Sequence, residues 1–215
     1  MQDLAVVTGM IIKAVPIGEY DRRLVLLTKE RGKISAFVRG ARKPNSRFVA
    51  ATNLFCFGTF KLYQGRDSYT LAEAEISNYF EELHMDFEGA YYGMYFLEIA
   101  DYYTRENNDE REMLKLLYQS LRAISVPSIS NHLVRAIYEL KAVIVNGEFP
   151  GIPEERSYLP STEYAVDYIV NSSIEKLYTF TVTEEVLSEI KGIASGICKL
   201  CLSTRFKSLE ILDTL

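Results

Sequence analysis

Hydrophobic and polar residues change their spacing along this chain, and the change divides it into two parts. In the first part, apolar residues fall in short runs separated by turn residues, which is the pattern of β-strands. Five such runs, at 6–15, 22–29, 33–39, 53–63 and 68–76, are predicted to be strands. Gly58 lies inside the fourth run, where a bulge or a barrel corner would fit. Five short, closely spaced strands predict a small barrel or sandwich.

From residue 87 onward, apolar residues recur every three or four positions, which indicates amphipathic helices. Gly147 suits the position just after a helix, and Thr183 with its two following glutamates suits a helix start. Residues 148–161 contain three prolines and are predicted to be a loop or irregular insert. The pattern predicts an α+β protein whose boundary falls within 77–86. The helical stripes are Phe87, Tyr91, Met94 and Tyr95; Leu114, Leu117, Leu121 and Ile124; Leu133, Ile137, Leu140 and Ile144; and Val186, Ile190, Ile193, Ile197 and Leu200.

The composition of the 215 residues is that of an ordinary globular protein, because 48% are hydrophobic and 25% are charged. No basic leader precedes an apolar stretch, and no run approaches the roughly 18 apolar residues of a membrane span. Three cysteines suit a reducing compartment better than a disulfide framework, so we expect a cytoplasmic protein with no membrane association. The net charge of −5, read alone, argues against nucleic-acid binding.

The charge is unevenly distributed, however, and this changes the expectation about partners. Residues 1–80 hold 12 basic and 7 acidic side chains, whereas residues 81–215 hold 12 basic and 22 acidic ones. A basic surface of this kind suits phosphate backbones, because each neutralised phosphate releases counterions. We predict that the following nine cations bind DNA: Arg22, Arg23, Lys29, Arg31, Lys33, Arg39, Arg42, Lys43 and Arg47.

Aromatic residues near these cations could stack on unpaired bases, although we expect most of them to belong to the core. The candidates for stacking are Phe37, Phe48, Phe55, Phe57 and Tyr63.

Catalytic and metal-binding patterns find little support. The loop 40–47 lacks the spacing of a phosphate-binding P-loop, no nucleophile elbow occurs, and His84 and His132 have no evident partners. Cys198 and Cys201 form one Cys-x-x-Cys pair, but a zinc site usually needs two such pairs, so structural cysteines in a helix are the better interpretation. We therefore predict no catalytic residue, no metal and no cofactor.

Several segments resemble the RecO family of bacterial recombination mediators. The resemblance implies an N-terminal five-stranded OB-fold barrel over residues 1–80 and a mainly α-helical domain over residues 81–215. It also implies a non-enzymatic protein of the nucleoid that binds single- and double-stranded DNA, anneals complementary strands and, with RecR, helps load RecA on strands coated by single-strand-binding protein. The segments that carry it are 18–28 (GEYDRRLVLLT), Gly32-Lys33-Ile34, 39–47 (RGARKPNSR), Tyr63-Gln64-Gly65, Glu75 and 205–209 (RFKSL).

One stretch departs from the family pattern. Many members carry a four-cysteine zinc module in the helical domain, but the corresponding stretch here, 147–163, contains no cysteine. We therefore expect no zinc, and an insert that is held by packing of Phe149, Ile152, Tyr158 and Leu159. The acidic tail of single-strand-binding protein would need cations beside an apolar groove, and nothing in the sequence selects among Arg122, Arg135, Lys141 and Lys199.

Two other functions compete with DNA annealing. An OB-like barrel could instead be a protein-interaction module that does not bind DNA directly. A DNA-processing enzyme is a weaker alternative, because metal-dependent nucleases need clustered carboxylates and only Asp21, Glu30 and Asp67 lie near the basic segment.

Overall fold

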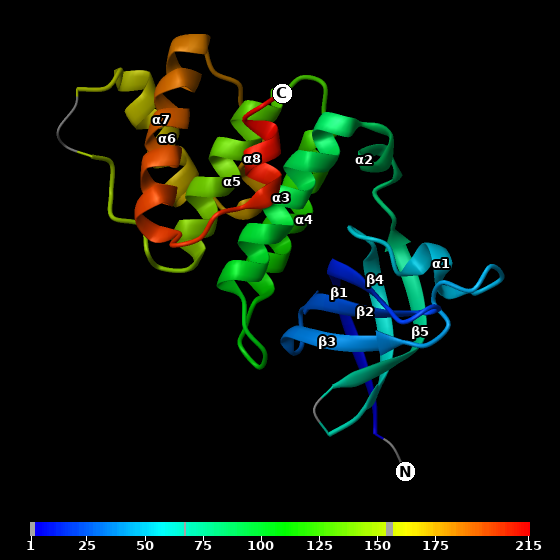
Figure 1. Cartoon of the computed structure of the whole chain (residues 1–215). Coiled ribbons are helices and arrows are strands. Elements are labelled where there is room, and N and C mark those ends of the chain that lie inside the picture. The colour runs from blue at the N-terminus through cyan, green and yellow to red at the C-terminus, as the bar shows by residue number, and fades with distance from the viewer. Residues whose placement is uncertain (1–2, 67, 154–156) are drawn as a thin grey trace. The chain divides into compact units, whose positions relative to one another are not determined.

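The computed structural model describes residues 3–66, 68–153 and 157–215 (Figure 1). The chain divides into two compact units, which we call the barrel unit (residues 1–81 and 100–114) and the helical unit (residues 82–99 and 115–215). The strands are β1 Leu4–Ile17, β2 Asp21–Thr28, β3 Gly32–Val38, β4 Phe57–Gln64 and β5 Tyr69–Asn78. The helices are α1 Phe48–Ala51, α2 Glu81–Met85, α3 Phe87–Tyr103, α4 Arg111–Ile124, α5 Asn131–Val145, α6 Pro160–Asn171, the 3₁₀ turn η1 Ile174–Lys176, α7 Glu184–Cys201 and α8 Lys207–Leu212.

The five strands close into a barrel in the order β1-β2-β3-β5-β4. Every neighbouring pair is antiparallel except β3 and β5, which run parallel. The long β1 pairs with β4 through its first half and with β2 through its second half, which closes the barrel without a free edge. This arrangement, followed by helices, confirms the predicted α+β class with an N-terminal OB-fold barrel.

The barrel interior is filled by alternate residues of each strand, as the period of a β-strand requires. Leu24 and Leu26 of β2 and Ile34 and Ala36 of β3 are all buried in one cluster, and Phe60 of β4 belongs to the same cluster. Gly58 fits the predicted irregularity, because the register of β4 against β5 shifts at Phe57 and Gly58. A Cβ on Gly58 would stand 2.1 Å from the carbonyl oxygen of Glu75, so only glycine allows this close approach.

The fourth strand begins later than the sequence pattern predicts. Residues 53–56 were expected to be extended, but β4 starts at Phe57. Phe55 has a positive φ of 70°, its side chain is buried, and its backbone N–H donates to the carbonyl of Ile11 at 3.2 Å. A left-handed residue breaks the strand, and a run of apolar side chains gives no sign of it.

The segment 100–114 joins the barrel unit, although it follows residues of the helical unit in sequence. The N–H of Lys33 donates to the carbonyl of Arg105, and the N–H of Asn107 donates to the carbonyl of Arg31, both at 3.0 Å. Gly32 permits this contact, since it has a φ of 63° and a Cβ there would lie 2.3 Å from the Arg105 carbonyl oxygen. The turn between β2 and β3 is therefore covered by the chain's own backbone.

In the helical unit, α5 is the most deeply buried helix, and ten of its residues are buried. Phe96 of α3 stacks on Tyr138 of α5, with ring centroids 4.2 Å apart. Two predicted helix ends are confirmed: the Thr183 hydroxyl caps α7 by accepting the N–H of Val186, and Gly147 follows α5 with a φ of 74°.

The stretch predicted to be an irregular insert runs between α5 and α6, and its last residues, from Pro160, form the start of α6. Of the residues expected to hold it by packing, Phe149, Ile152 and Tyr158 are half-buried, whereas Leu159 is 41% exposed.

Candidate nucleic-acid interface

The β2–β3 hairpin distributes the nine predicted cations between its two ends. The two strands are antiparallel, so that Arg22 faces Val38 and Leu27 faces Lys33. Arg22 and Lys29 are thus about 23 Å apart along the strand. Three cations lie at the turn end, and the other six lie at the open end with the loop that follows β3. The hairpin therefore does not bring all nine cations onto one surface.

The turn-end cations are Lys29, Arg31 and Lys33, and two of them are held by the protein itself. The Lys33 ammonium donates to the backbone carbonyl of Asp101 at 2.6 Å and to its carboxylate at 3.1 Å. The Arg31 guanidinium donates to the Tyr69 hydroxyl at 3.0 Å and lies 5.7 Å from the centre of that ring. Lys29 is exposed.

Asp101 is the centre of this internal network, and sequence reasoning missed it. It accepts a hydrogen bond from the ammonium of Lys13 at 2.7 Å as well as that from Lys33. Burial pushes the pKa of Asp101 upward, but the two lysines outweigh this effect and hold the pKa below its ordinary value of 3.8. The carboxylate is therefore charged at neutral pH and forms ion pairs with both Lys13 and Lys33.

The open end of the hairpin carries the loop 39–47, which we call the basic loop. Its start is fastened to the β1–β2 turn: the Asp21 carboxylate accepts the N–H of Gly40 at 2.7 Å, and the N–H of Arg42 donates to the Tyr20 carbonyl at 2.8 Å. Gly40 has a φ of 65°, which favours glycine in this turn. The loop is thus fixed at its base while its cationic side chains stay exposed.

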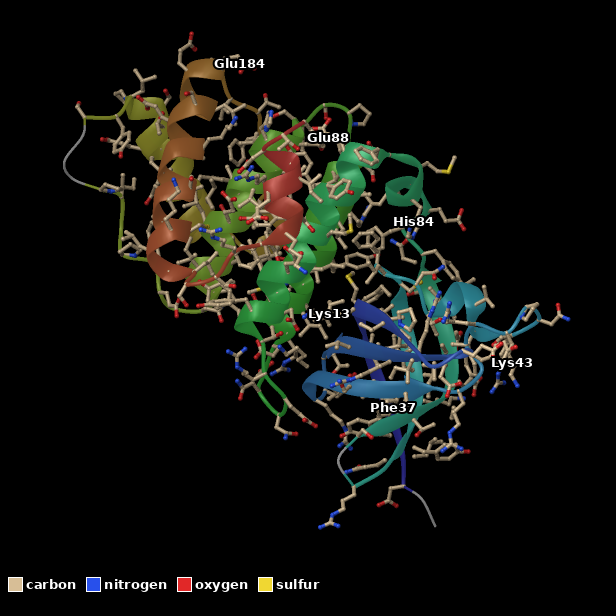
Figure 2. The ribbon with its side chains drawn as sticks, viewed as in Figure 1. Lys13, Phe37, Lys43, His84, Glu88 and Glu184 are labelled. Carbon is tan, nitrogen blue, oxygen red and sulfur yellow. The ribbon has the colours of Figure 1, made fainter. Side chains whose placement is uncertain are left out.

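The four cations of the basic loop differ in their contacts. Arg39 is exposed and makes no side-chain hydrogen bond or ion pair with the part of the chain that the structure describes. The Lys43 ammonium lies 5.7 Å from the centre of the Tyr20 ring, and Figure 2 shows it on the loop beyond β3, on the opposite side of the barrel from Lys13. The Arg42 guanidinium donates weakly to the Glu19 carbonyl at 3.3 Å.

Arg47 ends the basic loop and anchors it to β5. Its guanidinium donates to the carbonyl of Ala72 at 2.6 Å and lies 4.8 Å from the centre of the Phe48 ring. None of these four cations forms an ion pair with a carboxylate among the described residues, although Arg47 is close enough to Glu73 to lower the pKa of that carboxylate.

The two remaining cations of the open end have different environments. Arg22 is partly buried, and its guanidinium donates to the Thr52 carbonyl, the Thr52 hydroxyl and the Asn53 side chain at 2.9–3.0 Å. This contact holds the chain between α1 and β4. Arg23 points outward, is exposed, and donates to the Ser35 hydroxyl at 3.1–3.2 Å.

An outward-facing row of side chains crosses the strands beside the basic loop. Arg23 of β2 faces Phe37 of β3, Phe37 faces Thr70 of β5, and Thr70 faces Tyr63 of β4. Directly opposed residues share a face of the sheet, so Phe37 and Tyr63 stand about 10 Å apart on the barrel exterior. Phe37 is 38% exposed and Tyr63 is 42% exposed. Of the other predicted stacking residues, Phe55 is buried, and Phe48 and Phe57 are half-buried.

Comparison with known proteins decides the family. The N-terminal model of the family described as recombination protein O matches residues 1–80, and its C-terminal model matches residues 84–151. The chain belongs to the RecO family. A relative named DNA repair protein RecO in Acetivibrio thermocellus is 27% identical and is aligned over 97% of this chain and 96% of its own length. A relative of the same name in Clostridium perfringens is 29% identical over 95% of each chain.

The alignment with the first RecO relative also bears on length. It spans 240 positions, more than the 215 residues of this chain, so that relative contains residues without a counterpart here. A third RecO relative, from Shouchella clausii, is 31% identical over 66% of this chain and 55% of its own length.

The structure also shows the surroundings of the four cations that were considered as contacts for the acidic tail of single-strand-binding protein. Lys141 is buried and donates to three backbone carbonyls, and Arg135 donates to the buried Glu139 at 2.8 Å. The Lys141 and Arg135 side chains are therefore already bonded to groups of the helical unit, whereas Arg122 and Lys199 are exposed.

The cysteines and possible metal ligands are also placed. Burial raises the pKa of the Cys198 thiol well above its ordinary value, and Cys201 lies one turn further along α7. Among the described residues, no cluster of three or more histidine, cysteine, aspartate or glutamate side chains could hold a metal ion. Within the same ranges, no helix is long and apolar enough to cross a bilayer.

Proposed function

We propose that this chain acts in DNA repair and recombination by binding single- and double-stranded DNA on the open end of its barrel. The observation that carries the proposal is the basic loop, whose cations Arg39, Arg42, Lys43 and Arg47 are exposed and unpaired with carboxylates within the described structure. Arg23 extends this surface along β2. Membership of a family whose relatives are named DNA repair protein supports the same role.

The proposed interface combines phosphate contacts with base stacking. The cations bind phosphates without reading sequence, while Phe37 and Tyr63 offer ring faces to unpaired bases. Binding is therefore tolerant of sequence and steeply dependent on salt. A strand held in this way has part of its charge neutralised, so a complementary strand meets less repulsion and can anneal. No bond is made or broken by the protein in this scheme, so the function proposed is that of a non-enzymatic mediator.

Further partners follow from the family rather than from the geometry. We propose that the chain acts in the cytoplasm at the nucleoid and cooperates with RecR to load RecA onto strands coated by single-strand-binding protein. The exposed cations Arg122 and Lys199 are the remaining candidates for holding the acidic tail of that protein.

The test is fluorescence anisotropy with a labelled single-stranded oligonucleotide across a salt series. We expect the triple variant Arg39→Glu, Arg42→Glu, Arg47→Glu to weaken binding at least about 30-fold and to reduce the salt slope by about 2. The double variant Arg39→Glu, Lys43→Glu removes two cations that make no hydrogen bond to the barrel, and it should weaken binding without affecting folding. The matched control reverses three exposed cations of the helical unit, Arg122, Lys199 and Lys207, and should bind nearly as the parent protein does.

A protein-interaction module without DNA binding remains the second candidate, and one observation favours it. β1 exposes four aliphatic side chains, because Leu4, Val6 and Val15 are 51–53% exposed and Ile17 is 38% exposed. If the charge-reversed variants bind DNA as the parent does, or if DNA binding by the parent shows no salt dependence, the proposed DNA surface is wrong. If the parent itself does not bind DNA, this second function is favoured.

A further inference from the structure

A groove in the helical unit lies between α6, the irregular segment 179–183 and the start of α7. It has a volume of about 730 Å³. Tyr164 and Tyr168 of α6 line the groove together with Phe180 and Val182, and Val186 of α7 lines it as well. Tyr164 is 73% exposed, so a large aromatic side chain lies at the mouth of the groove rather than in the core. Aromatic side chains with this exposure are typical of binding surfaces.

The wall of the groove is held in place before any ligand arrives. The Tyr168 hydroxyl donates to the carbonyl of Lys176 at 3.1 Å and lies 3.2 Å from the hydroxyl of Thr179. The Tyr168 ring meets the Phe180 ring edge-on, with centroids 5.3 Å apart and an angle of 76° between the planes. Because these contacts fix Thr179 and Phe180 against α6, this wall of the groove is already in place when a ligand binds.

The backbone of this segment is available for pairing. Residues 180–182 lie in neither a helix nor a strand, and Thr183 begins the capping of α7. Across the described parts of the chain, neither Thr181 nor Val182 makes a backbone hydrogen bond. Backbone N–H and C=O groups without a partner can pair with the backbone of an added peptide, which is a common mode of peptide recognition.

The charged side chains around the groove indicate which kind of partner it can bind. Residues 160–189 contain six carboxylates and the cation Lys176, and of these carboxylates Glu175 is paired with Lys115 of α4. Glu163 and Asp167 are exposed on α6 next to the two tyrosines, and Glu184 and Glu185 are exposed in the first turn of α7, where Figure 2 shows Glu184. Such a rim repels DNA and acidic peptides and attracts basic ones.

We propose that this groove binds an extended, basic segment of a partner protein. An apolar side chain of the segment enters between Tyr164 and Phe180, its backbone adds as a strand to residues 180–182, and its cations face Glu163, Asp167 and the start of α7. The site uses none of the residues of the proposed DNA surface and is independent of it.

The probe is a fluorescent peptide of alternating lysine or arginine and phenylalanine or valine, titrated into the full-length chain. We expect micromolar binding, an affinity loss of about tenfold for Tyr164→Ala, and a similar loss for the double variant Glu163→Lys, Asp167→Lys. A peptide with glutamates in place of its cations should not bind, and N-methylation of alternate backbone nitrogens should weaken binding. Matched controls are Tyr79→Ala and the double variant Glu81→Lys, Glu210→Lys, which should bind as the parent does.

Three results would overturn the proposal: unchanged binding by Tyr164→Ala, equal binding of the acidic peptide, or equal loss in the control variants. Analytical sedimentation of the chain without peptide tests whether the groove binds a second copy of the chain instead. If the chain self-associates and Tyr164→Ala abolishes the association, the groove takes a second copy of the chain, and the proposal of a separate partner is wrong.

Discussion

At the scale of single residues, Lys141 shows that a charged side chain can have a structural role when it is buried. Its ammonium lies at the C-terminal end of α6 and donates to the carbonyls of Ile169, Val170 and Ser172 at 3.0, 2.9 and 2.8 Å. Terminal helix carbonyls lack partners within the helix, and a cation there also meets the negative end of the helix dipole. A residue that reads as a surface cation in the sequence is thus a structural link between α5 and α6.

We predict that Lys141→Met destabilises the protein by about 2–3 kcal/mol, because methionine fills the space but leaves the three carbonyls without this donor. Urea unfolding should show a lower midpoint with an unchanged slope. Lys199→Met, the same substitution at an exposed position of α7, should change the stability by less than about 0.5 kcal/mol. Equal stability of the two variants would refute the capping role of Lys141.

At the scale of elements, the β2–β3 hairpin shows why charge clustering in sequence does not define a surface. The strands and their turn were predicted within a few residues, since alternation and turn residues are local signals. The contact of the turn with the segment 100–114 could not be predicted, because it joins residues about 70 positions apart and depends on Gly32 accepting a close backbone approach. Through that contact Lys33 is paired with Asp101, while the length of the hairpin separates it from the basic loop.

This contact predicts a pH dependence. The pKa of Asp101 is lowered in the folded protein, so its stabilising effect is present above the ordinary value of 3.8 and is lost as the pH falls through the lower folded value. Asp101→Asn should cost about 1–2 kcal/mol at pH 7, and the difference from the parent should shrink as the pH is lowered from about 4 toward 3. Urea unfolding of the parent and of Asp101→Asn at several pH values measures this difference in stability.

The control for this prediction is Glu81→Gln, which neutralises an exposed carboxylate that forms no ion pair within the described structure. It should show almost no difference from the parent at any pH. A constant cost of Asp101→Asn across the same pH range would contradict the role of the ionised carboxylate.

At the scale of the whole molecule, the uneven charge follows the sequence more closely than the two units, because the segment 100–114 brings five carboxylates into the barrel unit and leaves it with 14 cations and 13 carboxylates. The proposed DNA surface lies in the part with an excess of cations, and the proposed peptide groove lies in the part with an excess of carboxylates. The stretch 147–163 contains no cysteine, which bears on metal binding by the whole protein.

We predict that the intact protein requires no zinc. Metal analysis should find less than about 0.1 zinc per chain, and dialysis against a chelator should leave the unfolding temperature unchanged, because structural zinc contributes folding free energy wherever it is bound. Stoichiometric zinc, or a loss of thermal stability after chelation, would show that this expectation is wrong.

The sequence by itself determined the five strands to within a few residues, the helices α3, α4, α5 and α7, the OB-fold barrel followed by helices, the RecO family and the caps at Gly147 and Thr183, because these depend on local spacing and on turn chemistry. It did not predict α6, which begins inside the predicted loop. Only the tertiary structure decided which cations are exposed. Arg22, Arg31, Lys33 and Lys141 are held by partners far away in the sequence, whereas Arg39, Arg42 and Lys43 project from a loop. Partners of this kind are set by packing between distant elements, and no local pattern of residues encodes them.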